Sequence, residues 1–202
     1  TLAPSPEPSA TLAPSPEPSA TLAPSPEPSA TLAPFFAAPT SSLPAVASPS
    51  ELTYEVMFQY IGAEYDIDWR LLASMAYKES SLNPSAIGRD GEIGLMQILP
   101  STWDEFAPKA GVSDPFDPVS NVQVGATYLA YVRDQLIWRG YPEEYWALVA
   151  YNWGPNNLGR LLKDEGNWGG IPILRQNYAY DIIDQIASPT ANWWHLLKEP
   201  VY

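Results

Sequence analysis

The chain has 202 residues, with 23 acidic and 10 basic side chains and a formal net charge of -13. Since no cluster of basic residues offsets this charge, nucleic acid and anionic membrane surfaces are poor partners. There is no cysteine and only one histidine, His195, which excludes a disulfide framework and thiolate or serine–histidine catalysis and leaves no ligand set for zinc. We therefore expect no metal and no other cofactor.

Residues 1–50 differ from the rest of the chain in composition. They open with three identical copies of Thr-Leu-Ala-Pro-Ser-Pro-Glu-Pro-Ser-Ala and hold 13 of the 23 prolines. Proline lacks a backbone donor and the segment has no apolar periodicity, so we predict a disordered linker, partly in the polyproline II conformation. Residues 51–202 hold all eight tryptophans and suffice for one globular domain. No apolar run approaches 18 residues, so no transmembrane segment is expected.

The first half of the predicted domain has the pattern of helices separated by a glycine-rich loop. Apolar residues recur at helical spacing in residues 51–65, and Asp68 is a typical N-cap for a second helix that ends by Asn83. The glycines of residues 85–94 indicate backbone that bends sharply or approaches a ligand, although an ordinary surface turn has the same pattern. Residues 95–99 predict a short apolar element, and Pro100 predicts the start of a helix.

The second half is also helical in pattern. Asp117 and Pro118 predict the start of a long helix, and a helix opened by Pro142 should stop at Gly154. Two more helices are predicted, over residues 156–163 and 173–187, on either side of a glycine-rich turn. The aromatic tail should pack back on the domain, with sugar contact as the alternative. Because no segment alternates as a strand does, the fold class is mainly α.

Glu79 stands out within the second predicted helix. It follows Leu72, Met75 and Ala76 at helical spacing, which puts a carboxyl group on the stripe that faces the core. Burial penalises the charged form, so such a glutamate can hold a proton near neutral pH and act as a general acid. The alternative is that the helix ends before Glu79 and leaves the side chain in solvent.

Four short motifs occur in order along the domain. They are Glu79-Ser80-x-x-Asn83-Pro84, Gly94-Leu95-Met96-Gln97, Ala150-Tyr151-Asn152-x-Gly154 and Asn177-Tyr178. Taken together they resemble the successive motifs of the soluble lytic transglycosylase catalytic domain, a lysozyme-like helical fold that includes the goose-type lysozymes. Each motif alone is weak, but their order makes a strong joint signal.

The resemblance implies a domain that binds peptidoglycan glycan strands in a cleft and cleaves the β-1,4 bond between N-acetylmuramic acid and N-acetylglucosamine. It implies that Glu79 is first the acid and then the base, that the substrate's N-acetyl oxygen assists, and that a 1,6-anhydro sugar forms without water. It also implies a monomer that works outside the cytoplasm, in the cell envelope or secreted.

The resemblance further implies a set of substrate-binding residues, namely Ser80, Met96, Gln97, Tyr151, Asn152 and Tyr178. Gln97 has both a donor and an acceptor for an N-acetyl group. Three of these residues keep a structural alternative: Ser80 as a plain helix-end serine, Met96 as a core methionine, and Tyr178 as a core aromatic. For Tyr178 we favour a hydroxyl aimed at Glu79.

The chain also departs from the family pattern. Many members have serine where this chain has Gly88, and Glu-Thr-Arg where it has Leu174-Arg175-Gln176. Goose-type lysozymes have aspartates near Gly-Leu-Met-Gln that orient a water, whereas Gly88 and Leu99 cannot, which favours transglycosylation. Asp90 and Glu92 lie in the same loop and are either solvated charges or groups that reach a water. Hydrolysis by a lysozyme of the same fold, a catalytically silent wall-binding module and a chitin-directed glycosidase remain as alternatives.

Overall fold

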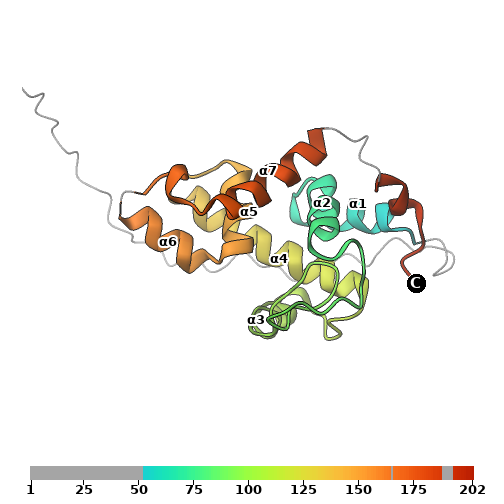
Figure 1. The fold of residues 1–202 in the computed structure, drawn as a ribbon. Helices are drawn as coiled ribbons and strands as arrows, with labels where there is room; N and C mark the ends of the chain where they lie inside the picture. The colour runs from blue at the N-terminus through green and yellow to red at the C-terminus, as the bar shows by residue number, and fades with distance from the viewer. Residues whose placement is uncertain (1–51, 165, 188–192) are drawn as a thin grey trace, which may run out of the picture. The chain divides into compact units, whose positions relative to one another are not determined.

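The computed structural model describes residues 52–164, 166–187 and 193–202. The predicted linker, residues 1–50, lies outside the described residues. Within them the chain forms helices joined by turns, with three isolated β-bridges and no strand, so the mainly α class is confirmed (Figure 1). The α-helices are α1 (Tyr54–Tyr65), α2 (Trp69–Ser80), α3 (Pro100–Ala110), α4 (Pro118–Ile137), α5 (Glu144–Trp153), α6 (Pro155–Lys163) and α7 (Ile173–Ala187), and two short 3-10 helices cover Trp168–Gly170 and Trp194–Lys198.

Side-chain caps explain where the predicted helices begin. An Asp68 carboxylate oxygen accepts from the Arg70 amide at 2.9 Å, and an Asp117 oxygen accepts from the Ser120 amide at 2.8 Å. Pro118 occupies the first turn of α4, where the missing N–H costs nothing. Helix α2 ends because Ser81 adopts a left-handed conformation with φ of 56°.

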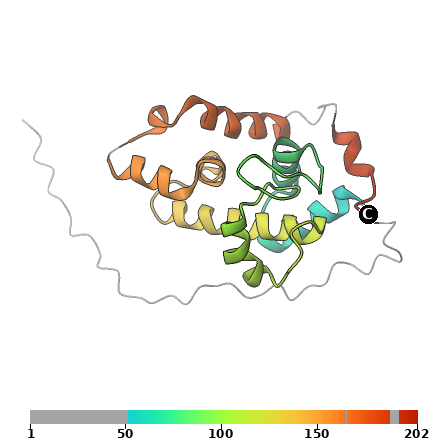
Figure 2. The same ribbon diagram turned by 60° about the horizontal axis from the view of Figure 1, so that its bottom comes forward.

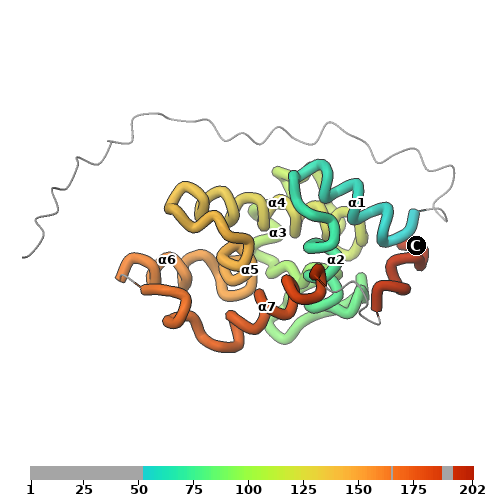
Figure 3. The backbone as a smooth tube through the Cα atoms, turned by 90° about the horizontal axis from the view of Figure 1, so that it is seen from above, coloured from blue at the N-terminus to red at the C-terminus, as the bar shows by residue number. Residues whose placement is uncertain are grey.

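Helix α4 is the centre of the packing. It contacts α1, α3 and α5, while α7 lies against α2 and α5. Figure 3 shows α4 beside α3 and α5, and Figure 2 shows the loop after α2 lying between α4 and α7. The contact between α2 and α7 brings the first and the last of the four motifs together.

Three local predictions are wrong. Residues 95–99 form no regular element, because Gly94 and Gln97 have φ values of 75° and 48° that interrupt it, and only an isolated bridge pairs Ile93 with Ile98. Helix α5 begins at Glu144 rather than at Pro142. The helical spacing of residues 173–187 also predicts one face shared by Leu174, Tyr178, Ile182 and Ile186, but Leu174, in the first turn of α7, is 76% exposed.

The aromatic tail packs back on the domain, as predicted. The Trp193 ring stacks on Tyr77 with 4.5 Å between centroids, and Trp194 meets Trp69 edge-on at 5.8 Å. The Val201 amide then donates to the Leu52 carbonyl at 2.8 Å, so both ends of the described domain meet. None of the helices in the described ranges is long and apolar enough to cross a membrane.

Candidate active site

Glu79 lies in the last turn of α2 and is half-buried, so the alternative in which the helix ends before it is wrong. The Tyr178 hydroxyl, from α7, donates to Glu79 Oε1 at 2.7 Å. Burial is the largest influence on the pKa of Glu79 and raises it, and the charge of Glu92 raises it further. The Tyr178 hydrogen bond and the charges of Lys78 and Arg175 lower it. The net effect is a raised pKa, as a general acid requires.

Ser80 is not among the residues that line the pocket beside Glu79, and its hydroxyl links two backbone segments. Its Oγ lies 2.9 Å from the Leu95 carbonyl oxygen and 3.1 Å from that of Ala76. These contacts join the end of α2 to the turn formed by residues 94–97. In this structure Ser80 is a helix-end serine. Any effect that it has on Glu79 comes from holding the end of α2 in position.

The turn of residues 94–97 is held by Asn121, a buried residue of α4. The Asn121 Oδ1 accepts from the Met96 amide at 2.8 Å, and its Nδ2 donates to the carbonyls of Ile93 and Pro115 at 3.0 and 2.9 Å. A Cβ at Gly94 would lie 2.4 Å from that same Nδ2. Glycine is needed here both for its positive φ and for the close approach of Asn121.

Met96 belongs to the core. Its side chain is 0% exposed and packs over Gly125 of α4, where an added Cβ would come within 2.9 Å of its Cγ. A side chain with no exposed surface cannot touch a bound sugar, so the core alternative holds and direct substrate contact by this side chain does not. The Met96 carbonyl accepts from the Tyr151 hydroxyl at 2.9 Å, which links the turn to α5.

Gln97 faces the pocket with its acceptor only. Its Nε2 donates to the Gly94 carbonyl at 2.9 Å and, more weakly, to that of Ala86 at 3.4 Å. Carbonyl oxygens only accept, so the amide orientation follows and Oε1 is the atom left for a ligand. The structure thus leaves the predicted acceptor available, whereas the amide donors make contacts within the protein.

The last turn of α5 places Tyr151 and Asn152 beside this turn. Burial raises the pKa of the Tyr151 phenol well above its usual value, so it stays a neutral donor. The Asn152 Oδ1 accepts from Arg175 Nη1 of α7 at 2.6 Å. Arg175, which the sequence suggested only as a departure from a family pattern, thus links α5 to α7 and also lowers the pKa of Glu79.

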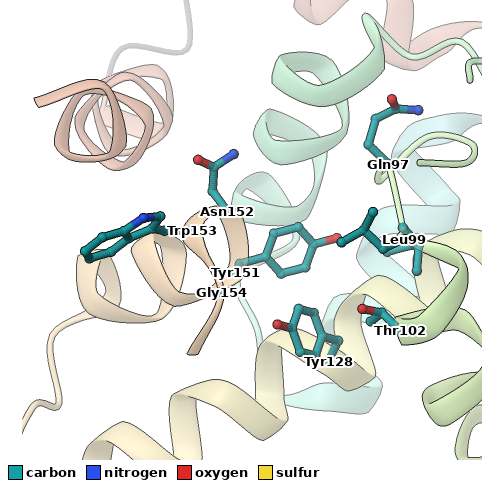
Figure 4. A pocket seen from close by; sticks show the side chains of 9 residues that line it. Gln97, Leu99, Thr102, Tyr128, Tyr151, Asn152, Trp153 and Gly154 are labelled. Carbon is teal, nitrogen blue, oxygen red and sulfur yellow. The ribbon is translucent and has the colours of Figure 1, made fainter. Parts of the chain in front are cut away.

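Four of these side chains, those of Glu79, Gln97, Tyr151 and Asn152, border one pocket of about 250 Å³. It is lined by Glu79, Gly88, Arg89, Glu92, Gln97, Leu99, Tyr151 and Asn152. A second pocket, of about 140 Å³, adjoins it through Gln97, Leu99, Tyr151 and Asn152 and extends to Tyr128 and Trp153. Figure 4 shows the Tyr151 ring reaching from α5 toward Leu99, with Tyr128 and Thr102 to one side and Asn152 to the other. The two pockets therefore share four of their lining residues.

The pocket is not a metal site by composition. Across the described part of the chain, no three histidine, cysteine, aspartate or glutamate side chains gather in a way that could hold an ion. The polar groups of the pocket are two carboxyls, one guanidinium and amide or phenol groups, which suit proton transfer and hydrogen bonding to a sugar.

The chain is similar to a family of known proteins. The family model described as the Transglycosylase SLT domain matches residues 56–172, more than half of the chain. The chain belongs to this family. Membrane-bound lytic murein transglycosylase F of Pseudomonas fluorescens strain Pf0-1 is 39% identical to this SLT domain over 112 residues, covering 54% of this chain and 22% of the relative. The same protein of Alteromonas mediterranea is 37% identical over 134 residues, covering 63% and 27%.

The SLT chain therefore spans about a quarter of the length of the curated relatives it matches. Among solved structures, the 70-kDa soluble lytic transglycosylase of Escherichia coli aligns with a TM-score of 0.48 at 24% identity, over 72% of this chain and 22% of that one. An inactive mutant of the Pseudomonas aeruginosa enzyme Slt aligns with a TM-score of 0.48 at 21% identity, over the same shares.

Sequence reasoning missed two positioning residues of this SLT domain. Asn121 interrupts the apolar pattern of α4 directly before Val122, and a polar residue on a buried helix face is a signal for a backbone segment that needs hydrogen bonds. Arg175 had no comparable signal, because only the packing of α7 on α5 brings it to Asn152. Glu92, one of two loop carboxylates considered for a water, lines the pocket, and Asp90 is not among its lining residues.

Proposed function

We propose that residues 51–202 form a lytic transglycosylase domain that cleaves the β-1,4 bond between N-acetylmuramic acid and N-acetylglucosamine in peptidoglycan. The observation that carries this proposal is a half-buried Glu79, hydrogen-bonded by Tyr178 at 2.7 Å, at the wall of a polar pocket. Membership of the SLT family supports it, and so do the names of the relatives, which describe them as lytic murein transglycosylases.

In the first step, protonated Glu79 donates its proton to the leaving glycosidic oxygen. The raised pKa keeps a useful fraction of the group protonated near neutral pH. Because Oε1 already accepts from Tyr178, the proton belongs on Oε2, and the hydrogen bond fixes which way the acid points. The substrate's N-acetyl oxygen bonds to C1 as the C1–O bond breaks, in place of a second protein carboxylate.

In the second step, ionised Glu79 takes the proton of the muramic C6 hydroxyl. The C6 oxygen bonds to C1, the acetyl oxygen leaves it, and a 1,6-anhydro ring forms with no water consumed. The Tyr178 hydrogen bond and the Arg175 charge stabilise the ionised form of Glu79. They oppose burial, which favours the protonated form, so the site supports both states that the two steps require.

Peptidoglycan as substrate would place this domain outside the cytoplasm, in the cell envelope or secreted. The Pro-rich segment of residues 1–50 would then act as a tether. We also propose that the domain acts on its substrate as a monomer.

The test is mass spectrometry of soluble fragments released from purified peptidoglycan by the full chain, with Glu79→Gln run in parallel. Transglycosylation gives fragments about 18 Da lighter than hydrolysis gives, the mass of one water. We expect the lighter fragments from the wild type and a loss of about 10³-fold in Glu79→Gln. Binding to peptidoglycan without release of any fragment would support the wall-binding alternative instead.

Hydrolysis remains a second candidate because of one observation. Glu92 lines the same pocket as Glu79 and so provides a second carboxylate that could orient a water. Fragments with reducing ends, produced by the wild type and absent with Glu79→Gln, would move the domain to the lysozyme side.

A further inference from the structure

Residue 88 has to be glycine because there is no room for a side chain, and not because of its backbone conformation. Among nearby glycines, Gly91 and Gly94 have φ values of 87° and 75°, which favour glycine, but Gly88 has no positive φ. A Cβ at residue 88 would lie 2.2 Å from Glu92 Oε2 and 2.6 Å from Gln97 Oε1. The space that a side chain at 88 would fill is therefore taken by oxygen atoms from two other residues.

One hydrogen bond holds the Glu92 carboxylate in this position. Its Oε2 accepts from the Asp90 amide at 2.9 Å, and its backbone carbonyl accepts from the Gly88 amide at 2.8 Å. The adjoining bridge between Ile93 and Ile98 ties the loop to the rest of the turn. Within residues 52–164, 166–187 and 193–202, Glu92 Oε1 accepts no hydrogen bond, so it can accept one from a ligand.

The two groups that meet over Gly88 both present acceptors. The Gln97 amide nitrogen already donates to the carbonyls of Gly94 and Ala86, which leaves Oε1, and the atoms that the Glu92 side chain offers are carboxylate oxygens. A ligand that satisfies both must therefore bring donors. Sugars of a glycan strand have such donors in their hydroxyl groups and in the N–H of the acetamido group.

We propose that Glu92 is a substrate-binding residue, and that its carboxylate, together with Gln97 Oε1, accepts hydrogen bonds from hydroxyl or acetamido N–H groups of the sugar bound beside Glu79. This inference rests on the proposed function for the identity of the ligand. It gives Gly88 a definite role, since any larger residue there would displace both acceptors from the pocket wall. It also separates Glu92 from Asp90, whose side chain does not line the pocket.

The experiment measures binding in the full chain carrying Glu79→Gln, so that no substrate is consumed. The probe is a soluble tetrasaccharide of alternating N-acetylglucosamine and N-acetylmuramic acid, and calorimetry gives the Kd. Glu92→Ala in this background should raise the Kd by about 10-fold, the usual effect of losing a hydrogen bond to a charged group. Asp90→Ala is the matched control and should leave the Kd within about twofold, since only its backbone contacts Glu92.

Gly88→Ala provides the second arm. The atoms that its methyl group would meet are the far ends of two flexible side chains, so Tm should stay within about 2 °C while the Kd rises by about 10-fold. The double variant Gly88→Ala with Glu92→Ala should bind within about twofold of Gly88→Ala alone, because Gly88→Ala already displaces the Glu92 carboxylate.

A wild-type-like Kd for Glu92→Ala, or losses that multiply in the double variant, would overturn the proposal. It would also be overturned if the unmutated chain released reducing ends that disappear in Glu92→Gln, because Glu92 would then act on water. Failure of the proposed function has a different signature, namely no released fragment from the unmutated chain, and the Kd series is measured independently of release.

Discussion

Two half-buried glutamates in this domain, Glu79 and Glu144, show what burial does and what it does not do. Burial is the main cause of a raised pKa in both. Glu79, however, receives a hydrogen bond from Tyr178 and opens on the larger pocket, whereas Glu144 Oε1 has no hydrogen-bond partner in the described part of the chain. Glu144 is also absent from the lining of both site pockets. A raised pKa therefore marks a general acid only when a partner orients the group and a ligand can reach it.

The surroundings of Glu144 explain why it is tolerated. It lies in the first turn of α5, where the helix dipole favours a negative charge. The charge of Arg133 lowers its pKa, while that of Asp68 raises it. These effects are those of a structural carboxylate near a helix N-terminus. Glu144 can therefore serve as a control for Glu79, since burial raises the pKa of both carboxyl groups.

The largest expected effect separates these two carboxylates directly. Glu79→Gln should lower the rate of fragment release from peptidoglycan by about 10³-fold, because the variant cannot donate or accept the proton. Glu144→Gln should stay within about threefold of the wild type, since it touches neither pocket. The measurement is the initial rate of fragment release by both variants under the same conditions. An equal loss of rate in both would contradict the different roles given to Glu79 and Glu144.

A smaller effect is expected when the partner of Glu79 is removed. Tyr178→Phe should lower the rate by about 10- to 100-fold, because Glu79 loses its orienting donor. That hydrogen bond favours the ionised form, so its loss raises the pKa of Glu79 and moves the alkaline limb of the pH profile to higher pH. Tyr180→Phe, an exposed tyrosine on the same helix, is the control and should change neither rate nor profile.

The turn that supports the site can be tested through stability. Asn121→Ala removes three hydrogen bonds and leaves buried backbone groups unsatisfied, which should cost about 2–3 kcal/mol of the free energy of unfolding. Chemical denaturation measures the change. Asn156→Ala, on the exposed side of α6, should change it by less than about 0.5 kcal/mol. Similar costs for the two variants would show that the Asn121 network does not hold the turn.

The smallest expected effect is on the pH dependence of stability. The folded pKa of Glu79 lies above its unfolded value, so the group destabilises the fold progressively as pH rises from about 4.5 through the folded pKa. Glu79→Gln should therefore have a higher Tm than the wild type at pH 7, and the gap should close near pH 4. Each kcal/mol of added free energy of unfolding corresponds to a rise in Tm of about 2–4 °C. Glu144→Gln should change in the same direction, and a Tm gap that widens toward acid pH would contradict the assignment.

Local signals predicted most of the helices. Asp68 and Asp117 cap α2 and α4 as their side chains suggested, and the periodic apolar residues of α4 are buried at its centre. The backbone conformation of the turn at residues 94–97 was harder to predict from the sequence. Gln97 has a φ of 48°, which cannot be predicted from its residue type. This backbone conformation depends on the hydrogen bonds that Asn121 makes from α4, far away in the sequence.

The same limit applied to the candidate site. Glu79 could be found because its position on an apolar stripe and the motifs around it are local. The burial of Met96, the committed donors of Gln97 and the link between Asn152 and Arg175 depend on packing between segments far apart in the chain. A motif names residues that act together, but it does not say which of them faces the ligand.

The pairing of Leu52 with Val201 has a consequence for protein engineering. Their backbone groups are hydrogen-bonded at 2.8 Å, and the Tyr54 amide reaches the Glu199 carbonyl at 3.2 Å. A linker of a few residues between these segments would close the backbone of the domain into a ring. New ends could then be opened at Gly140, an exposed turn where nothing lies within 4 Å of an added Cβ, to give a circular permutant with the same pocket lining.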